Sequence, residues 1–336
     1  MMKQSITVTP SILLVIIILL TACKDHNSTP TPLTWSQLPA IPNVYREEAS
    51  SFSIGTNAYF GLGFGNNDGR YNANATYNND FWEFNSTTNV WRRITDFQGS
   101  KRSGATSFSI NGRGYIAFGY STSCPTNGGL CDFMYYDDVW EYNPNTNTWR
   151  KVASFNSISG LRYATAFVIN NKAYILTISE CLEFDPVTYS FRKRAACPIG
   201  LFSGAFSLNN KGYVFLGDPD IEQNKRVYEY DPITDIWSRK KDFPGQPRIL
   251  PTSFSLNGYG YCGGGYRRGS TFQYFKEFWK YNPTTDEWTQ IEDYPGVGSV
   301  WLQSMVIGGS AIIGSGYGSE TNLLRYDNSF WLFQPK

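Results

Sequence analysis

The chain has little histidine and few charged side chains. Its 336 residues include one histidine, His26, and 17% are charged, against about a quarter in an average soluble protein. A single histidine excludes mechanisms that need two imidazoles or a histidine base in a folded core. The 29 basic and 28 acidic residues give a net charge of +1 and form no basic stripe, so we expect no nucleic-acid partner.

The N-terminal region lacks a hydrophobic run long enough to span a membrane. Residues 12–20 are apolar, but a bilayer core needs roughly 20 such residues. After Lys3, this run is typical of the apolar segment of a signal peptide. The following Leu20-Thr21-Ala22-Cys23 resembles the bacterial lipobox, which implies a signal peptide over 1–22 and a lipid on Cys23. The alternative is an ordinary secretory signal.

Residues 23–33 are polar and interrupted by proline, which predicts a tether before a folded body over 34–336. Lys24 after the cysteine resembles the outer-membrane sorting pattern of bacterial lipoproteins. We therefore expect a lipid anchor in the bacterial outer membrane, with the body either periplasmic or surface-exposed.

Five other cysteines remain. In an oxidising compartment, Cys124 and Cys131 are close enough in sequence to close one loop with a disulfide. Cys181 and Cys197 are a weaker candidate pair, and Cys262 is expected to be a buried apolar residue. The cysteines lack CxxC spacing and histidine co-ligands, so we expect no zinc site.

Internal repetition is the strongest signal in the sequence. One series joins two residues seven positions apart: Phe52 and Tyr59, Phe108 and Tyr115, Phe167 and Tyr174, Phe206 and Tyr213, Phe254 and Tyr261, Met305 and Ile312. A second series has the same spacing: Phe84 and Trp91, Tyr142 and Trp149, Phe184 and Phe191, Tyr230 and Trp237, Tyr281 and Trp288. The two series predict six units.

Each unit is expected to form four short antiparallel strands. In the second unit, Asn111-Gly112 is a turn that leads from the strand holding Phe108 to one over 114–119. A third strand over 138–142 and a turn then lead to Trp149, which opens the fourth. Repeated four-stranded units of this length are typical of the blades of a β-propeller.

The glycines that end the second strand, followed by an aromatic residue, Asn-Pro or Asp-Pro and a tryptophan, resemble the kelch repeat. The resemblance covers residues 34 to about 330 and implies an all-β, six-bladed kelch propeller with four-stranded antiparallel blades. The third unit departs most, with Ile178 at the glycine position and Phe191 at the tryptophan position. Trp35 to Pro42 matches a fourth strand, so we expect this N-terminal strand to close the last blade; the competing candidate is 330–333.

In this topology the long connections lie on one face, which makes that face the expected binding surface. Four arginines recur there just before the innermost strands: Arg46, Arg102, Arg162 and Arg248. They could form a collar for a carboxylate at the channel mouth or hold neighbouring loops together. Loop aromatics, including Tyr136 and Tyr266, could stack on sugars, contact a protein or cover the blade ends.

The inner strands contain no acid, so hydrolysis by paired carboxylates is disfavoured, although Glu47 and Glu48 lie near the loop face. The kelch resemblance includes galactose oxidases, but their copper site needs histidines that this body lacks. We expect no catalytic residue, metal or cofactor. The sequence favours a non-catalytic module that binds a glycan or an envelope protein. The alternative is a mutarotase resembling the N-acetylneuraminate epimerases, in which an arginine holds the sugar carboxylate and a loop acid moves the proton.

Overall fold

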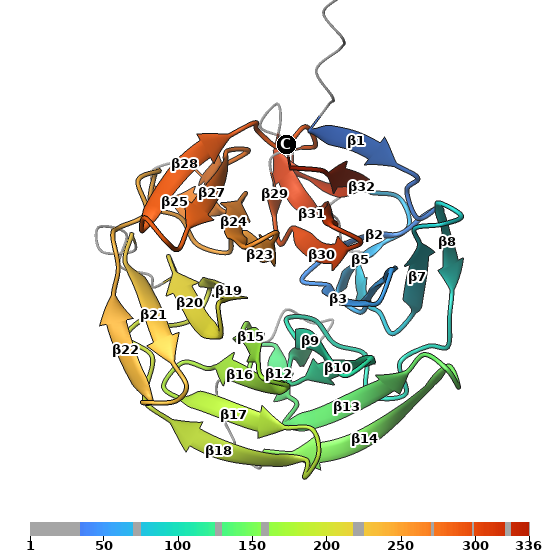
Figure 1. The fold of residues 1–336 in the computed structure, drawn as a ribbon. Helices are drawn as coiled ribbons and strands as arrows, with labels where there is room; N and C mark the ends of the chain where they lie inside the picture. The colour runs from blue at the N-terminus through green and yellow to red at the C-terminus, as the bar shows by residue number, and fades with distance from the viewer. Residues whose placement is uncertain are drawn as a thin grey trace, which may run out of the picture. The chain divides into compact units, whose positions relative to one another are not determined.

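The computed structural model describes residues 34–69, 75–124, 130–155, 161–217, 225–269, 272–297, 299–319 and 324–335. The predicted signal peptide (1–22) and tether (23–33) lie outside these residues. The described chain is all-β, and its strands form six blades around a central axis (Figure 1). The predicted fold class is confirmed.

The strands of each blade follow one another from the axis outward. The innermost strands are β3 (Ser50–Ile54), β9 (Thr106–Ile110), β15 (Thr165–Ile169), β19 (Gly204–Leu208), β23 (Thr252–Leu256) and β30 (Gln303–Ile307). The second strands are β4 (Asn57–Gly61), β10 (Arg113–Ala117), β16 (Lys172–Leu176), β20 (Lys211–Phe215), β24 (Tyr259–Gly263) and β31 (Ser310–Ser319).

The outer half of each blade holds the second repeat series. The third strands are β7 (Phe81–Asn85), β13 (Asp138–Asn143), β17 (Cys181–Asp185), β21 (Val227–Asp231), β27 (Phe278–Asn282) and β32 (Leu324–Phe333). The outermost strands are β8 (Val90–Arg93), β14 (Thr148–Ser154), β18 (Ser190–Arg194), β22 (Ile236–Arg239), β28 (Glu287–Ile291) and β1 (Trp35–Leu38). The divergent third unit thus forms a regular blade of four strands.

The N-terminal strand closes the ring. β1 pairs antiparallel with β32, from Trp35 opposite Phe333 to Leu38 opposite Phe330, and Figure 1 shows the blue strand beside the dark red one. The competing segment 330–333 is therefore the third strand of blade 6, and β1 is its outermost strand. Closure by the N-terminal strand is confirmed.

Hydroxyl groups link the inner strands of neighbouring blades. The Ser107 hydroxyl donates to the Ser51 carbonyl oxygen at 2.7 Å, and the Ser253 hydroxyl donates to the Ala205 carbonyl oxygen at 2.9 Å. These bonds connect strands of different sheets, which have no shared backbone ladder. They explain why small hydroxyl residues flank the phenylalanine of most inner strands.

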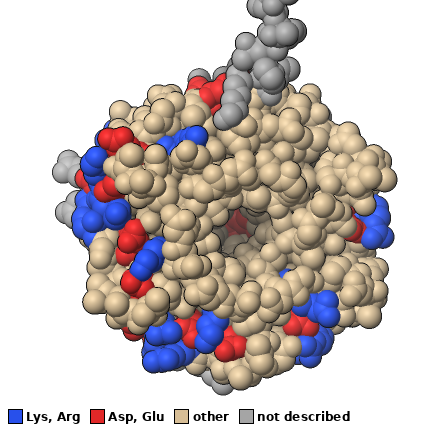
Figure 2. All heavy atoms as spheres, viewed as in Figure 1, with Lys and Arg blue, Asp and Glu red and all other residues tan. Residues whose placement is uncertain are grey.

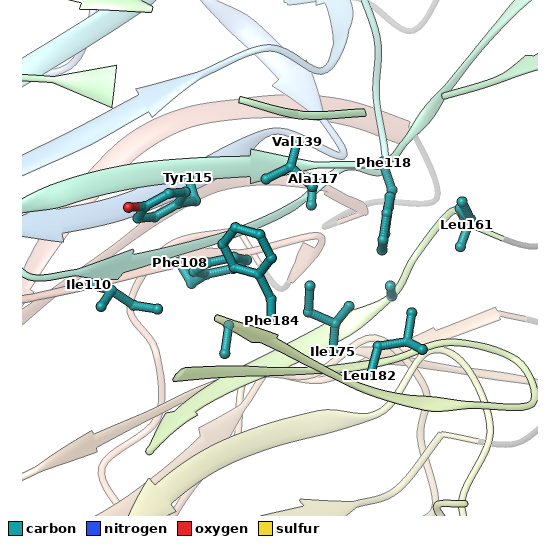
Figure 3. Close-up of a cluster of buried hydrophobic side chains, with 12 residues drawn as sticks. Phe108, Ile110, Tyr115, Ala117, Phe118, Val139, Leu161, Ile175, Leu182 and Phe184 are labelled. Atoms are coloured by element: carbon teal, nitrogen blue, oxygen red, sulfur yellow. The ribbon is translucent and has the colours of Figure 1, made fainter. Parts of the chain in front are cut away.

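The hydrophobic core lies in the seams between blades. In one seam, Phe108 and Tyr115 of blade 2 pack against Ile175 and Phe184 of blade 3 (Figure 3). A small residue stands second in each of the second strands. Where it is a glycine, a phenylalanine of the preceding blade covers it: a Cβ on Gly114 would lie 2.1 Å from the Phe52 ring.

Short extra sheets extend the loop face. β2 (Tyr45–Glu47), β5 (Phe64–Asn66) and β6 (Thr76–Tyr77) form one; β11 (Tyr120–Ser123) pairs with β12 (Asp132–Tyr135), and β25 (Tyr266–Arg268) with β26 (Phe272–Tyr274). A further short strand, β29 (Ser299–Val300), pairs with β31. The hairpins β5–β6, β11–β12 and β25–β26 lie in the connections between the second and third strands of blades 1, 2 and 5, which were expected on the binding face. The corresponding connection of blade 4, 218–225, lies almost wholly outside the described residues.

Candidate functional site

Three of the four predicted arginines are held inside their own blades. Arg102 is fully buried and donates to the Asp138 carboxylate at 2.5 and 3.2 Å and to the Phe118 carbonyl oxygen at 2.9 Å. Burial opposes ionisation of Asp138, but the hydrogen bonds and charge of Arg102 lower its pKa below the ordinary value. Arg102 thus ties the second and third strands of blade 2 to the segment before the first.

Arg46 and Arg248 repeat this arrangement. Arg46 donates to Asp80 at 2.8 and 2.9 Å and to the Leu62 carbonyl oxygen at 2.9 Å, and Arg248 donates to Glu277 at 2.5 Å. These three side chains point into the blades and bond to an acid and a carbonyl oxygen there, which is the structural one of the two roles that the sequence left open.

Arg162 lies in a different environment because it is shifted by one position. It precedes the phenylalanine of its inner strand by five residues, whereas Arg102 precedes its own by six. Its guanidinium carbon lies 5.3–5.8 Å from four aromatic ring centroids, those of Tyr120, Phe133, Tyr135 and Tyr163. Within the described part of the chain it forms no ion pair or hydrogen bond, so its donors are available to an anionic ligand.

The channel mouth is bordered by one left-handed residue from each blade. Each stands two positions before its inner strand, with φ between 52° and 65°: Glu48, Gly104, Tyr163, Phe202, Leu250 and Trp301. Bulky side chains rarely adopt this conformation, which costs of order 1–3 kcal/mol and clusters at functional sites. Five of the six positions nevertheless carry large side chains.

Backbone hydrogen bonds hold these residues in place. The Gly104 amide donates to the Glu48 carbonyl oxygen at 3.1 Å, and the Tyr163 amide donates to the Gly104 carbonyl oxygen at 3.0 Å. The Leu250 amide bonds in the same way to Phe202, at 2.8 Å. These three bonds link blade 1 to blade 2, blade 2 to blade 3 and blade 4 to blade 5 at the border of the mouth, and they hold the frame of left-handed residues at those junctions.

A cavity of about 250 Å³ opens at this frame and is lined by all six left-handed residues. Figure 2 shows the hollow at the centre of the ring from one face, with acidic atoms at its floor and most other charged side chains at the outer rim. The remaining lining is rich in hydroxyl and amide groups: Ser51, Thr106, Ser107, Thr165, Ser203, Thr252, Ser253, Gln303 and Ser304. None of the four predicted arginines lines it.

Glu48 is the one ionisable carboxyl of this lining. Its carboxylate accepts hydrogen bonds from the hydroxyls of Ser103 at 2.6 Å, Tyr163 at 2.8 Å and Tyr120 at 3.0 Å. The Tyr120 and Tyr163 hydroxyls also bond to each other, at 2.7 Å. Residues of three blades therefore share a connected network of proton donors and acceptors.

Burial sets the protonation of the two adjacent acids. Burial raises the pKa of Glu48. The hydrogen bonds that its carboxylate accepts from Ser103, Tyr163 and Tyr120 act in the opposite direction, as does the positive charge of Arg162. Burial also raises the pKa of Glu47 to about 8, with a further contribution from the negative charge of Glu48. Glu48, which lines the cavity, is thus a carboxyl that keeps its proton to higher pH than an exposed glutamate does.

Aromatic side chains meet across the mouth. The Tyr163 ring of blade 3 stacks on Trp301 of blade 6, with centroids 4.9 Å apart and planes at 29°. Phe202 lies 5.1 Å from Tyr163 on the other side. Rings beside hydroxyl and amide groups are the surfaces that a sugar needs, because its CH faces are apolar and its edges polar.

The other predicted site residues lie away from this cavity. The Tyr136 ring covers Arg102 at 4.0 Å, and its hydroxyl bonds to Ser121. Tyr266 packs against Phe272 on the β25–β26 hairpin. Cys124 and Cys131 form a disulfide beside the β11–β12 hairpin. Cys23 lies outside the described residues.

The described ranges offer neither a metal site nor a membrane-spanning helix. They contain no group of three or more histidine, cysteine or acidic residues placed to hold a metal. In the same residues, no helix has both the length and the apolar character needed to cross a membrane.

Sequence reasoning missed most of the channel mouth. It named Glu48 only as a loop acid and overlooked Tyr120, Tyr163, Trp301 and Gln303. One signal was available: aligning the units places Glu48, Tyr163 and Trp301 at the same position of the repeat, where the bulk and chemistry of the side chain vary most.

Comparisons with known proteins agree with the fold. The kelch motif matches residues 128–156. The solved structure of YjhT superposes with a TM-score of 0.69 at 18% identity, over 87% of this chain and 95% of that one. At this identity the likeness establishes the fold alone, and the chain is a kelch-repeat propeller in architecture.

Curated relatives fall into two groups. Kelch-like protein 21 of Rattus norvegicus is 24% identical over 71% of this chain and 37% of its own length. The N-acetylneuraminate epimerase of Escherichia coli K12 is 29% identical over 46% and 39%, and that of Pasteurella multocida is 23% identical over 62% and 49%. The chain thus spans less than half the length of these relatives.

Proposed function

We propose that the protein is an epimerase of acidic sugars that interconverts the anomers of an N-acetylneuraminate-like sugar at the channel mouth. The observation that carries this proposal is Glu48, a buried carboxyl with a raised pKa, which lines a cavity of hydroxyl, amide and aromatic groups next to Arg162. The similarity to N-acetylneuraminate epimerases supports it.

Each group has a part in this reaction. Arg162 binds the sugar carboxylate, because its guanidinium can donate two parallel hydrogen bonds to it. The rings of Tyr163 and Trp301 hold the apolar face of the sugar, and Gln303 bonds to its hydroxyls. The ligand thereby places its anomeric centre beside Glu48.

Glu48 supplies the proton. Its carboxyl donates a proton to the ring oxygen as the bond from that oxygen to the anomeric carbon breaks, and water takes the proton of the anomeric hydroxyl. This yields the open-chain keto acid. Rotation about the adjacent C–C bond and the reverse transfers close the ring on the other face, so atoms and charge balance and Glu48 regains its proton.

The test is the rate at which a pure anomer of N-acetylneuraminic acid equilibrates, followed by NMR. We expect the wild-type protein to accelerate it and Glu48→Gln to lower kcat by about 10²-fold or more. Arg162→Met should raise KM by about tenfold or more, through loss of the charged hydrogen bonds. The control Glu47→Gln changes an adjacent buried carboxyl outside the cavity and should keep the wild-type rate.

A sugar-binding role without turnover is the second candidate. One observation favours it: both carboxylate oxygens of Glu48 already accept hydrogen bonds from protein hydroxyls, as in a purely structural network. In that case the sugar binds, but no variant or wild-type protein changes the rate of anomer exchange. A protein that neither binds nor converts the sugar contradicts both candidates.

We propose further that Cys23 carries a lipid and anchors the propeller in a bacterial outer membrane, as its lipobox-like sequence indicates. Metabolic labelling with a palmitate analogue should mark the wild-type protein and not Cys23→Ser. A wild-type protein that stays unlabelled contradicts the anchor.

A further inference from the structure

The β11–β12 hairpin carries exposed aromatic residues. Phe133 and Tyr135 are exposed, at 49% and 40%, although they are large and apolar in body. Their rings are nearly parallel, with planes at 13° and centroids 6.1 Å apart. Since alternate residues of a strand share a face, both lie on one side of β12 and Met134 on the other.

This face is continuous with the channel mouth. Tyr135 pairs directly with Tyr120 across the hairpin, and Tyr120 reaches Glu48 and Tyr163. The Phe133 ring lies 6.0 Å from that of Tyr120. The aromatic surface therefore starts at the cavity and extends outward along the hairpin.

Arg162 joins the two parts. Its guanidinium lies among the rings of Tyr163 and Tyr120 on the cavity side and those of Phe133 and Tyr135 on the hairpin side. An acidic sugar bound to Arg162 would thus have the hairpin rings directly beyond it.

The hairpin is held in place at both strands. The disulfide between Cys124 and Cys131 closes its described end, and the Tyr77 hydroxyl bonds to Thr122 at 2.9 Å from the neighbouring blade's loop. Exposed rings on a fixed support suit a ligand whose apolar faces stack without reshaping the protein.

The chemistry of the proposed function selects the ligand. Mutarotation needs a free anomeric hydroxyl, so the reducing end of the sugar must enter the cavity. A cavity of about 250 Å³ leaves room for one sugar residue, so any further residue lies outside it, and the hairpin rings beside Arg162 are the aromatic surface that adjoins it there.

We propose that Phe133 and Tyr135 form a second sugar subsite, so that the substrate is an oligosaccharide with an acidic sugar at its reducing end. This inference rests on the proposed function and extends it from a monosaccharide to a short glycan. Parallel rings stack on the second sugar while Arg162 holds the carboxylate of the first.

The test compares binding of N-acetylneuraminic acid with that of its α2,8-linked dimer by isothermal titration calorimetry. The wild-type protein should bind the dimer about tenfold more tightly, equivalent to about 1.4 kcal/mol. In the double variant Phe133→Ala with Tyr135→Ala, the ratio of dimer to monomer affinity should fall to about one, whatever the change in monomer affinity itself. Met134→Ala, on the opposite face of the same strand, should retain the advantage.

Two results overturn the subsite: a dimer that binds wild-type protein no more tightly than the monomer, or an advantage that survives in the double variant. If the monomer binds and equilibrates as expected in either case, the subsite alone is wrong. If neither sugar binds, the proposed function fails as well.

Discussion

One position along the chain decides what an arginine does in this repeat. Arg102 stands where its guanidinium reaches an acid and a carbonyl oxygen of its own blade. Arg162 stands one residue closer to its inner strand and lies among aromatic rings at the mouth instead. The same side chain therefore stabilises a blade at one position and is available to a ligand at the next.

Arg102→Met should destabilise the protein by about 3–5 kcal/mol, because it leaves the Asp138 carboxylate largely buried without its partner. Arg162→Met should cost less than about 1 kcal/mol, since it breaks no ion pair among the described residues. Urea unfolding of both variants measures the difference. Equal losses of stability would show that the two arginines share one structural role.

Glu47 makes stability depend on pH. Its pKa is raised to about 8 in the folded chain, so the folded state retains a proton that the unfolded chain releases near the ordinary value of 4.5. The contribution of Glu47 is fully present below pH 4.5 and is lost as pH rises towards 8.

Glu47→Gln should therefore match the wild-type stability at pH 4.5 and exceed it by about 1–3 kcal/mol at pH 8, less than the full shift allows. Unfolding at the two pH values tests this. A variant that is less stable than wild type at pH 8 would mean that the charged carboxylate is stabilised in the fold.

At the scale of the strand, a tyrosine and a glutamate face each other across the second and third strands of four blades: Tyr59 and Glu83, Tyr115 and Glu141, Tyr174 and Glu183, Tyr213 and Glu229. The Tyr115 hydroxyl donates to Glu141 at 2.8 Å. In blade 5, Lys280 faces Tyr261, and the buried Tyr261 hydroxyl has no hydrogen-bond partner in the described residues.

Tyr115→Phe should cost about 1–2 kcal/mol, because Glu141 loses a donor in a buried site. The matched change Tyr261→Phe should cost nothing or stabilise slightly, since it removes an unpartnered polar group. Thermal unfolding of the pair gives the comparison. A larger loss for Tyr261→Phe would show that its hydroxyl has a partner in solution.

The elements could be predicted from the sequence to different degrees. The blades were predictable because nearly every strand pair repeats two aromatic anchors at a fixed spacing, and Trp35 showed the same pattern outside the six units. The β11–β12 hairpin was not, because it lies in a long connection that most units lack; its counterpart is the β25–β26 hairpin of blade 5, where Phe272 to Tyr274 takes the place of Phe133 to Tyr135. Only the pairing with Tyr120 reveals Phe133 to Tyr135 as a strand.

At the scale of the whole molecule, β1 joins the two ends of the ring. Trp35 is buried against Phe278, Tyr294 and Phe333, with ring centroids 5.2, 5.6 and 4.9 Å away. Without this strand, β32 would expose an unpaired edge.

Trp35→Ala should destabilise the protein by about 3–5 kcal/mol through the cavity it leaves. It should also speed amide hydrogen exchange in β32 more than in β17, on the far side of the ring. Uniform acceleration in both strands would contradict a role of Trp35 in local closure.

The candidate site is assembled by the whole ring, which is why the sequence predicted so little of it. Its residues belong to four blades and lie up to 253 positions apart in the sequence, and only the closed ring brings them together: Glu48, Tyr120, Tyr163 and Trp301. The sequence pattern of one repeat unit cannot indicate which side chains of different blades meet at the axis of the propeller. The repeat predicted the frame, whereas the chemistry depends on which side chain each blade contributes to it.

The most direct measurement is a crystal structure of the protein with N-acetylneuraminic acid. The account predicts the sugar at the channel mouth, with its carboxylate on Arg162 and its anomeric carbon within hydrogen-bonding reach of Glu48. Sugar density elsewhere on the propeller, with Arg162 and Glu48 placed as in the free protein, would contradict it.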